Sequence, residues 1–188
     1  PPRSTLFPYT TLFRSLVNTV YTPSAADILN GSVVLTITGY AQAPCQNSQD
    51  AMVLTITKQA IVDAGENARI CENETLTLSD ATAGNAVSLL WSSNGDGSFD
   101  DATLLNAIYT PGTNDIITGS VMLTLSAQSA GNCVPVSDQM ILWISRQAIA
   151  TAGDDANSCE GGSFTLTGGS AQYHSSVYWT TSGTGIFN

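Results

Sequence analysis

The chain has 188 residues, with 15 acidic and five basic side chains, a net charge of −10 and a single histidine. Nucleic acids and anionic membranes are bound through basic surfaces, so this charge argues against both classes of partner. Apolar residues make up 43% of the chain, which is ordinary for a globular protein. No apolar run approaches the roughly 20 residues of a membrane-spanning helix, so we expect no membrane insertion.

The first fifteen residues differ in composition from the rest of the chain. They carry Arg3 and Arg14, two of the five basic residues. Residues 5–15, TLFPYTTLFRS, resemble the conceptual translation of a common sequencing adapter. We therefore interpret residues 1–15 as a disordered artefact and leave them out of the fold argument. The remainder has three basic and fifteen acidic residues, a net charge of −12.

An internal repeat organises the remaining chain. Residues 16–100 align with residues 104–188 at a constant offset of 88 and without a gap, and 33 of the 85 aligned positions are identical. The match begins at Leu16, directly after the adapter-like segment. A period of 88 is too long for a solenoid unit of about 20–50 residues, and it has the size of a small β-sandwich.

Apolar and polar residues alternate within the repeat, which is typical of strands with one buried face. The alternating runs lie at 75–78, 120–126 and 139–144. Clusters of turn-forming residues separate such runs, at 80–85, 94–97, 111–114 and 130–132. With essentially no helical window, this pattern predicts an all-β fold made of antiparallel β-sandwich repeats.

The phase of the repeat predicts one complete domain and two halves. The complete β-sandwich repeat runs from 60 to 147. Residues 16–58 form the C-terminal half of a preceding repeat, and residues 148–188 the N-terminal half of the next. A half-sandwich exposes strand edges and an apolar face, so the two halves could complement one another. We expect the natural protein to extend at both ends.

Four ordered blocks carry a resemblance to a known group. They are AGENARICENETLTL, WSSNGDGSF, IYTPGTNDIITGSVMLTLSA and SDQMILWI. The blocks resemble the PKD-like and Ig-like tandem repeats of large secreted surface proteins of Bacteroidetes, including gliding-motility-associated and type IX-secreted adhesins. The resemblance implies a sandwich of about seven strands that acts as a stalk, spacer or adhesive module, without enzymatic activity or cofactor. It places the protein at the cell surface, with neighbouring repeats and an external glycan or protein as partners. The alternative is a non-catalytic accessory module of a secreted multidomain hydrolase.

Four cysteines occupy two repeat-equivalent classes. An exported protein with an even cysteine count favours disulfides. Pairing Cys71 with Cys133 would keep the bond inside the complete repeat, whereas Cys45–Cys71 and Cys133–Cys159 would join neighbouring repeats. We favour the bond within the repeat, although an Ig-like topology puts its two cysteines at opposite ends. No cysteine and histidine spacing suggests zinc, so we expect no metal there.

One turn carries oxygen side chains at alternate positions, as the start of a calcium loop does. These residues are Asn94, Asp96, Ser98 and Asp100. The other repeat copy replaces them with residues that cannot supply the same ligands, namely Ser182, Thr184, Ile186 and Asn188. Both glycines and the phenylalanine of the turn persist in that copy. We therefore predict a turn that buries an aromatic side chain, with calcium binding as the weaker interpretation.

The remaining repeated residues are interpreted as structural. Trp91 and Trp179 are predicted to anchor the core of their repeats, as the tryptophan of Ig-type domains does. Asp27 and Asp115 precede a repeated isoleucine and are expected to form turn or capping hydrogen bonds. His174 stands where the other copy has alanine, and we expect no catalytic residues.

Overall fold

The computed structural model describes residues 17–188, and the chain divides into two compact units at Lys58 and Gln59. The described residues are mostly β-strand, with two short helices, so the fold class is all-β as the sequence predicts. Neither of these helices is long and apolar enough to cross a membrane. The interpretation of residues 1–15 lies outside the described residues.

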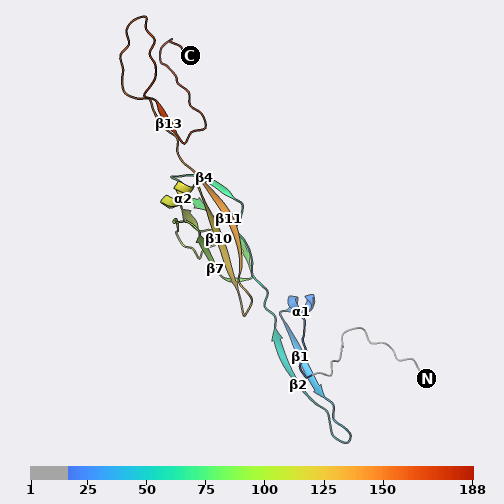
Figure 1. Cartoon of the computed structure of the whole chain (residues 1–188). Helices are drawn as coiled ribbons and strands as arrows, with labels where there is room; N and C mark the ends of the chain where they lie inside the picture. The colour runs from blue at the N-terminus through green and yellow to red at the C-terminus, as the bar shows by residue number, and fades with distance from the viewer. Residues whose placement is uncertain (1–16) are drawn as a thin grey trace, which may run out of the picture. The chain divides into compact units, whose positions relative to one another are not determined.

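The first unit holds one short helix and one hairpin. Helix α1 (Ala25–Asn30) is followed by strands β1 (Ser32–Gly39) and β2 (Ser48–Thr55), which pair in antiparallel fashion (Figure 1). Most of its side chains are exposed, because the hairpin has no second layer within its unit.

The second unit contains the complete repeat. The complete repeat has one helix, α2 (Thr113–Thr118), and nine strands, which are β3 (Ile61–Asp63), β4 (Ala68–Cys71), β5 (Leu76–Thr77), β6 (Thr82–Gly84), β7 (Ala86–Ser93), β8 (Ser98–Phe99), β9 (Ile108–Thr110), β10 (Ser120–Ser129) and β11 (Val136–Ser145). One sheet has the order β4-β11-β10-β7, a second has β5-β9-β8, and β3 pairs with β6. All of these pairs are antiparallel except β4 with β11, which is parallel.

The sheets of the complete repeat share one apolar core. Strand β10 alternates strictly between buried and half-buried residues over its ten positions, as its period of two requires. Leu123 and Leu125 of β10 and Leu142 of β11 are fully buried. They pack in one cluster with Tyr109 of β9 and Trp91 of β7, so the cluster joins the four-stranded sheet to the three-stranded one.

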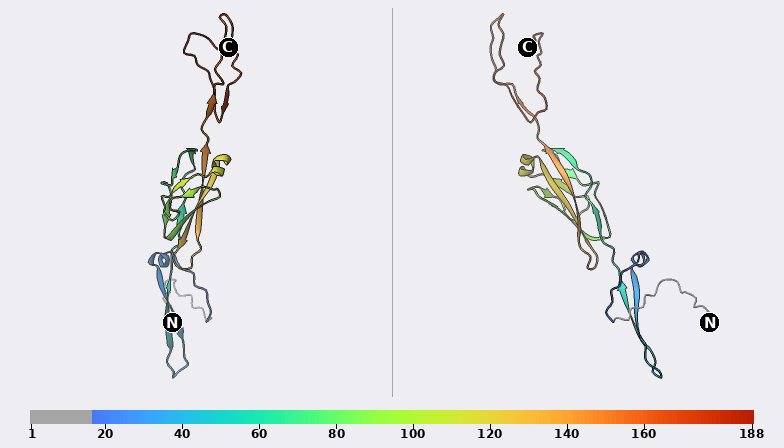
Figure 2. Two further views of the ribbon diagram at one scale, coloured as in Figure 1. Left: turned by 90° about the vertical axis from the view of Figure 1, so that its left-hand side faces the viewer. Right: turned by 45° about the vertical axis from the view of Figure 1, so that its right-hand side comes forward.

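The chain passes through the complete repeat from one end to the other. At the first end, the Gln59 side chain donates to the carbonyl of Val134, and the Ala60 N–H donates to the Ser129 hydroxyl, beside the β10–β11 hairpin. At the second end, Ser145 closes β11 next to Cys71 of β4. Three views agree that β11 leads away from the hairpin toward the end that carries α2 and β4 (Figures 1 and 2). Because β11 has ten residues, the two ends lie roughly 33 Å apart.

Positions 88 residues apart adopt the same pairings. Strand β1 pairs with β2 from Ser32 opposite Thr55, and β10 pairs with β11 from Ser120 opposite Trp143. Likewise β12 (Ile149–Thr151) pairs with β13 (Ser170–Gln172) in the register that β3 and β6 use. Each half-repeat therefore keeps the local pairing of its counterpart in the complete repeat.

The expectation of essentially no helix is wrong at two repeat-equivalent places. Helices α1 and α2 have six residues each, and both end at a glycine with a left-handed backbone, Gly31 at φ 74° and Gly119 at φ 81°. Each has an aspartate at its third position, which accepts hydrogen bonds at the helix start. A six-residue helix between two such signals has fewer than two turns, which is too short to produce a recognisable helical period in the sequence.

Candidate functional site

A buried aspartate organises the second end of the complete repeat. Asp115 in α2 is only 2% exposed. Its carboxylate accepts hydrogen bonds from the Tyr109 hydroxyl at 2.7 Å and from the N–H groups of Gly112 and Gly97 at 3.0 Å and of Asp96 at 3.2 Å. We call these five residues the Asp115 cluster. Four donors around one carboxylate satisfy a buried charge that would otherwise be costly.

The two glycines of residues 94–97, which we call the NGDG turn, are required by this close approach. A Cβ atom at Gly95 would overlap the Asp115 carboxylate, and a Cβ atom at Gly97 would overlap the Tyr109 hydroxyl. Only a residue without a side chain lets the turn backbone lie directly against the cluster. In the complete repeat, both glycines are therefore required by the position of an aspartate in a different element.

Asp96 caps helix α2 from this turn. Its carboxylate accepts the N–H groups of Asn114 and Asp115, each at about 3.0–3.1 Å, and the Asn114 side-chain amide at 3.1 Å. Gly112 precedes the helix and has no side chain to cap it, and a Cβ atom there would overlap Asp96. In helix α1, by contrast, the Ser24 hydroxyl accepts the N–H of Asp27 from within the same segment.

These contacts shift two ionisation equilibria. Burial, together with the hydrogen bond to Asp115, raises the pKa of Tyr109 to about 12, so the phenol stays protonated near neutral pH. The hydrogen bonds from the Asn114 and Asp115 backbone lower the pKa of Asp96 below its usual value. Both shifts favour the protonation states that hold the cluster together at neutral pH.

The predicted calcium side chains serve the turn itself. Asn94 accepts the N–H of Met122 at 2.8 Å, Asp96 caps α2, and Asp100 accepts the N–H groups of Asp101 and Ile108, both at 2.7 Å. Ser98 lies in β8 and its side chain is exposed. Within residues 17–188, no group of three acidic, cysteine or histidine side chains is arranged to hold a metal ion.

The two predicted core tryptophans have different surroundings. Trp91 is 2% exposed, donates from Nε1 to the carbonyl of Leu105 at 3.2 Å, and stacks on Phe99 with a centroid distance of 6.2 Å. Phe99 in turn contacts the Tyr109 ring at 4.9 Å, which links the core to the Asp115 cluster. Trp179 is 41% exposed, because its half-repeat has no layer that corresponds to β10 and β11.

The favoured disulfide between Cys71 and Cys133 is wrong. Cys71 ends β4 beside Ser145, whereas Cys133 lies in the β10–β11 hairpin beyond the opposite end of β11. A disulfide needs Cα atoms within about 7 Å, and these are separated by most of the length of the strand. Cys45 and Cys159 are exposed thiols, and the structure contains no disulfide among its described residues.

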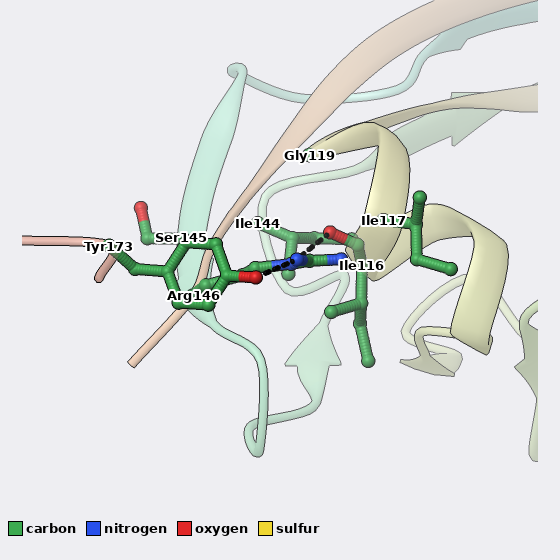
Figure 3. A pocket seen from close by; sticks show the side chains of 7 residues that line it. All are labelled: Ile116, Ile117, Gly119, Ile144, Ser145, Arg146 and Tyr173. Atoms are coloured by element: carbon green, nitrogen blue, oxygen red, sulfur yellow. Dashed lines mark hydrogen bonds between the residues drawn. The ribbon is translucent and has the colours of Figure 1, made fainter. Parts of the chain in front are cut away.

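An open hollow of about 420 Å³ lies where the complete repeat continues into the next half-repeat (Figure 3). The Arg146 guanidinium lies over the Tyr173 ring at 4.8 Å, donates to the Tyr173 hydroxyl at 2.6 Å and reaches the carbonyl of Ile116 at 3.4 Å. The other lining residues are Ile117, Gly119, Ile144 and Ser145. The lining contains one cation and otherwise apolar and hydroxyl groups, so it connects segments of the chain rather than presenting reactive groups.

Sequence reasoning predicted a capping role for Asp115 but missed its partners. The signal was present, because an aspartate, a tyrosine six residues earlier and a Gly-x-Gly turn recur together in both copies. Their spacing gave no indication that they meet, since the turn and the helix are 18 residues apart. No protein-family model matches this sequence, and no curated protein sequence matches it significantly.

Proposed function

We propose that this chain is part of a stalk or adhesive array of a large secreted bacterial cell-surface protein, built from Ig-like or PKD-like β-sandwich repeats. The observation that carries the proposal is the recurrence of two antiparallel strand pairings in identical register 88 residues apart. A repeated structural unit is typical of proteins that function by their length or by presenting the same binding surface several times. The extracellular location is inferred from the resemblance of the four sequence blocks to the repeats of secreted surface proteins.

The path of the chain through the complete repeat supports a spacer role. The chain enters beside the β10–β11 hairpin and leaves at the end of β11. Repeats connected in this way add length with each copy, roughly 35–45 Å including the loops. The acidic surface, with a net charge of −10 for the chain, keeps neighbouring copies soluble and apart.

The spacer role is tested by polypeptides that carry two, three and four copies of residues 60–147. Small-angle scattering should give a maximum dimension that grows by roughly 35–45 Å with each copy. A maximum dimension that grows much more slowly would mean that the copies collapse on one another, and would refute the spacer role.

The gene sequence beyond both ends separates the array from its alternative. Further 88-residue repeats followed by a cell-surface sorting domain would support the stalk or adhesin. A catalytic domain beside a few repeats would instead make this chain an accessory module of a secreted hydrolase.

A further inference from the structure

We propose that Arg146 and Tyr173 form a clasp that holds the complete repeat and the following half-repeat in one fixed orientation. The two positions then set the stiffness of the joint between consecutive repeats. This inference rests on the proposed array of repeats, because it concerns how neighbouring repeats in such an array are held. We call the pair the Arg146–Tyr173 clasp.

The complete repeat holds the two linker residues from two sides. Arg146 donates from Nε to the carbonyl of Ile116 in α2 at 3.4 Å. The Gln147 N–H donates to the Glu72 carboxylate at 3.2 Å, and the Gln147 side-chain carbonyl accepts the Asn73 amide at 3.5 Å. Helix α2 and the turn after β4 therefore fix the linker before the next strand begins.

Tyr173 ties the following half-repeat to the same linker. Strand β12 begins at Ile149, and its partner β13 ends at Gln172, directly before Tyr173. The Arg146 guanidinium lies over the Tyr173 ring at 4.8 Å and donates to its hydroxyl at 2.6 Å (Figure 3). The chain thus runs from Arg146 through β12 and β13 and returns to Arg146. Rotation of the half-repeat about the linker requires this contact to break.

One guanidinium serves both sides of the joint. Arg146 reaches the preceding helix through Nε and the following half-repeat through Nη1, and its planar group stacks on the tyrosine ring. A lysine ammonium has no planar face and no fixed fork of donors. The joint therefore depends on arginine itself and not only on its positive charge.

The backbone of Tyr173 is unusual for a tyrosine. Its φ is 55°, in the left-handed region, where asparagine is enriched and a bulky side chain is an outlier. Asn85, its counterpart one repeat earlier, has the same φ of 55°. The turn therefore favours asparagine, and a tyrosine at this place carries backbone strain. Such strain persists where other contacts compensate for it, and Tyr173 has that contact with Arg146.

The equivalent positions one repeat earlier hold a different pair. Lys58 stands in place of Arg146 and Asn85 in place of Tyr173, although the three residues after the cation, Gln-Ala-Ile, are the same in both linkers. The Asn85 amide donates to the carbonyl of Gln59 at 3.2 Å, within its own unit. An asparagine has no ring on which a cation could stack. The residues that build the clasp are thus specific to the joint after the complete repeat.

A stiff joint changes what an array of repeats can do. Units on freely turning linkers coil, so their mean reach grows with about the square root of their number. Units held in one orientation add their full length with each copy. An array that carries arginine and tyrosine at selected joints would combine straight stretches with points of bending.

The joint is tested on the full chain by pulsed electron paramagnetic resonance between two nitroxide labels. Cys71 and Cys159 take the labels, because both are exposed and they lie on the two sides of the joint. Cys45→Ser and Cys133→Ser leave these two as the only thiols. The clasp predicts one narrow distribution of label–label distances. A broad distribution in the chain that retains Arg146 would overturn the proposal.

Two variants introduce the residues of the preceding linker into this joint. Tyr173→Asn and Arg146→Lys should each roughly double the width of the distribution, because either change breaks the contact between ring and guanidinium. The double variant should be no broader than either single one, since both changes remove the same interaction. A double variant clearly broader than both would mean that the two residues act separately, and would overturn the clasp.

Tyr178→Asn is the matched control for Tyr173→Asn. Tyr178 lies in the same half-repeat and is 83% exposed, so its replacement should leave the width unchanged. Unchanged widths in the Tyr173 and Arg146 variants, or an equal broadening by Tyr178→Asn, would overturn the proposal.

The spacer role stands or falls independently of the clasp. The polypeptides that test the spacer role carry copies of residues 60–147, in which Asn85 occupies the position of Tyr173 at every joint. Their growth in length therefore does not depend on the clasp. The distances in the full chain, in turn, do not depend on further copies.

Discussion

Replacement of Asp115 by alanine tests whether the Asp115 cluster is the main polar support of the complete repeat. The variant removes the acceptor for one hydroxyl and three backbone N–H groups, all within 3.2 Å of the carboxylate. An unsatisfied buried donor costs about 1–3 kcal/mol. Because the NGDG turn is partly exposed and water can reach some of these donors, we expect a total loss of about 3–5 kcal/mol rather than the full sum. A domain of this size has about 5–15 kcal/mol of stability, so the loss is a large fraction.

The assay is urea unfolding followed by tryptophan fluorescence, which reports on the buried Trp91. Asp27→Ala is the matched control, because Asp27 occupies the equivalent position in the half-repeat but is more exposed than Asp115. The control should leave the transition of the complete repeat unchanged. A loss below about 1 kcal/mol for Asp115→Ala, or equal losses in both variants, would refute the reasoning.

Three further outcomes follow from the same geometry. Trp91→Ala should destabilise the complete repeat by about 3–5 kcal/mol. Trp179→Ala should leave the melting midpoint of the complete repeat unchanged in calorimetry. A Trp91→Ala variant of unchanged stability would contradict the assignment of Trp91 to the core. The pKa of Tyr109 is raised from 10 to about 12. The protonated phenol therefore contributes fully to the stability of the folded state below pH 10, and this contribution is lost as the pH rises toward 12. Tyr109→Phe should therefore lose less stability between pH 8 and 11.5 than the unaltered protein, as measured by the urea midpoint. An equal fall of the urea midpoint with pH in both proteins would argue against this role of Tyr109. A chelator should leave the melting midpoint unchanged, because the oxygen atoms of Asp96 and Asp100 are already used by backbone donors; a lowered midpoint would restore the calcium interpretation.

The sequence predicted the fold class because strand periodicity is a local signal. The run from Ser120 to Ser126 alternates in the printed sequence, and β10 alternates in burial in the same phase. The internal repeat extended this prediction to the half-repeats, where the same strand pairings form. The two helices were missed for the opposite reason, since each has only six residues and is specified by its caps rather than by periodicity.

The candidate site was predicted less well, because its contacts join distant segments. Cys71 and Cys133 were matched by counting one cysteine of each class per repeat, but the parallel pairing of β4 with β11 holds them at opposite ends of the unit. The oxygen-rich turn was predicted to bury an aromatic side chain, and calcium binding was kept as a weaker interpretation because oxygen side chains at alternate positions are visible in the sequence. The backbone N–H groups that occupy those oxygens, such as those of Asn114 and Met122, become apparent only in three dimensions.

The parallel pairing of β4 with β11 determines how the complete repeat responds to tension. Neighbouring segments attach at opposite ends of the unit, so a pull on the chain draws β3 and β4 toward one end and β11 toward the other. The two paired strands would then slide along their common axis. Under such shear, the pairing of Ala68 to Cys71 with Leu142 to Ser145 is loaded together rather than peeled one bond at a time. Forced unfolding is governed by the unfolding rate, and simultaneous loading of a row of bonds makes that rate low. We therefore expect the unit to unfold more slowly under a pull along its chain than it would if these bonds were broken one at a time.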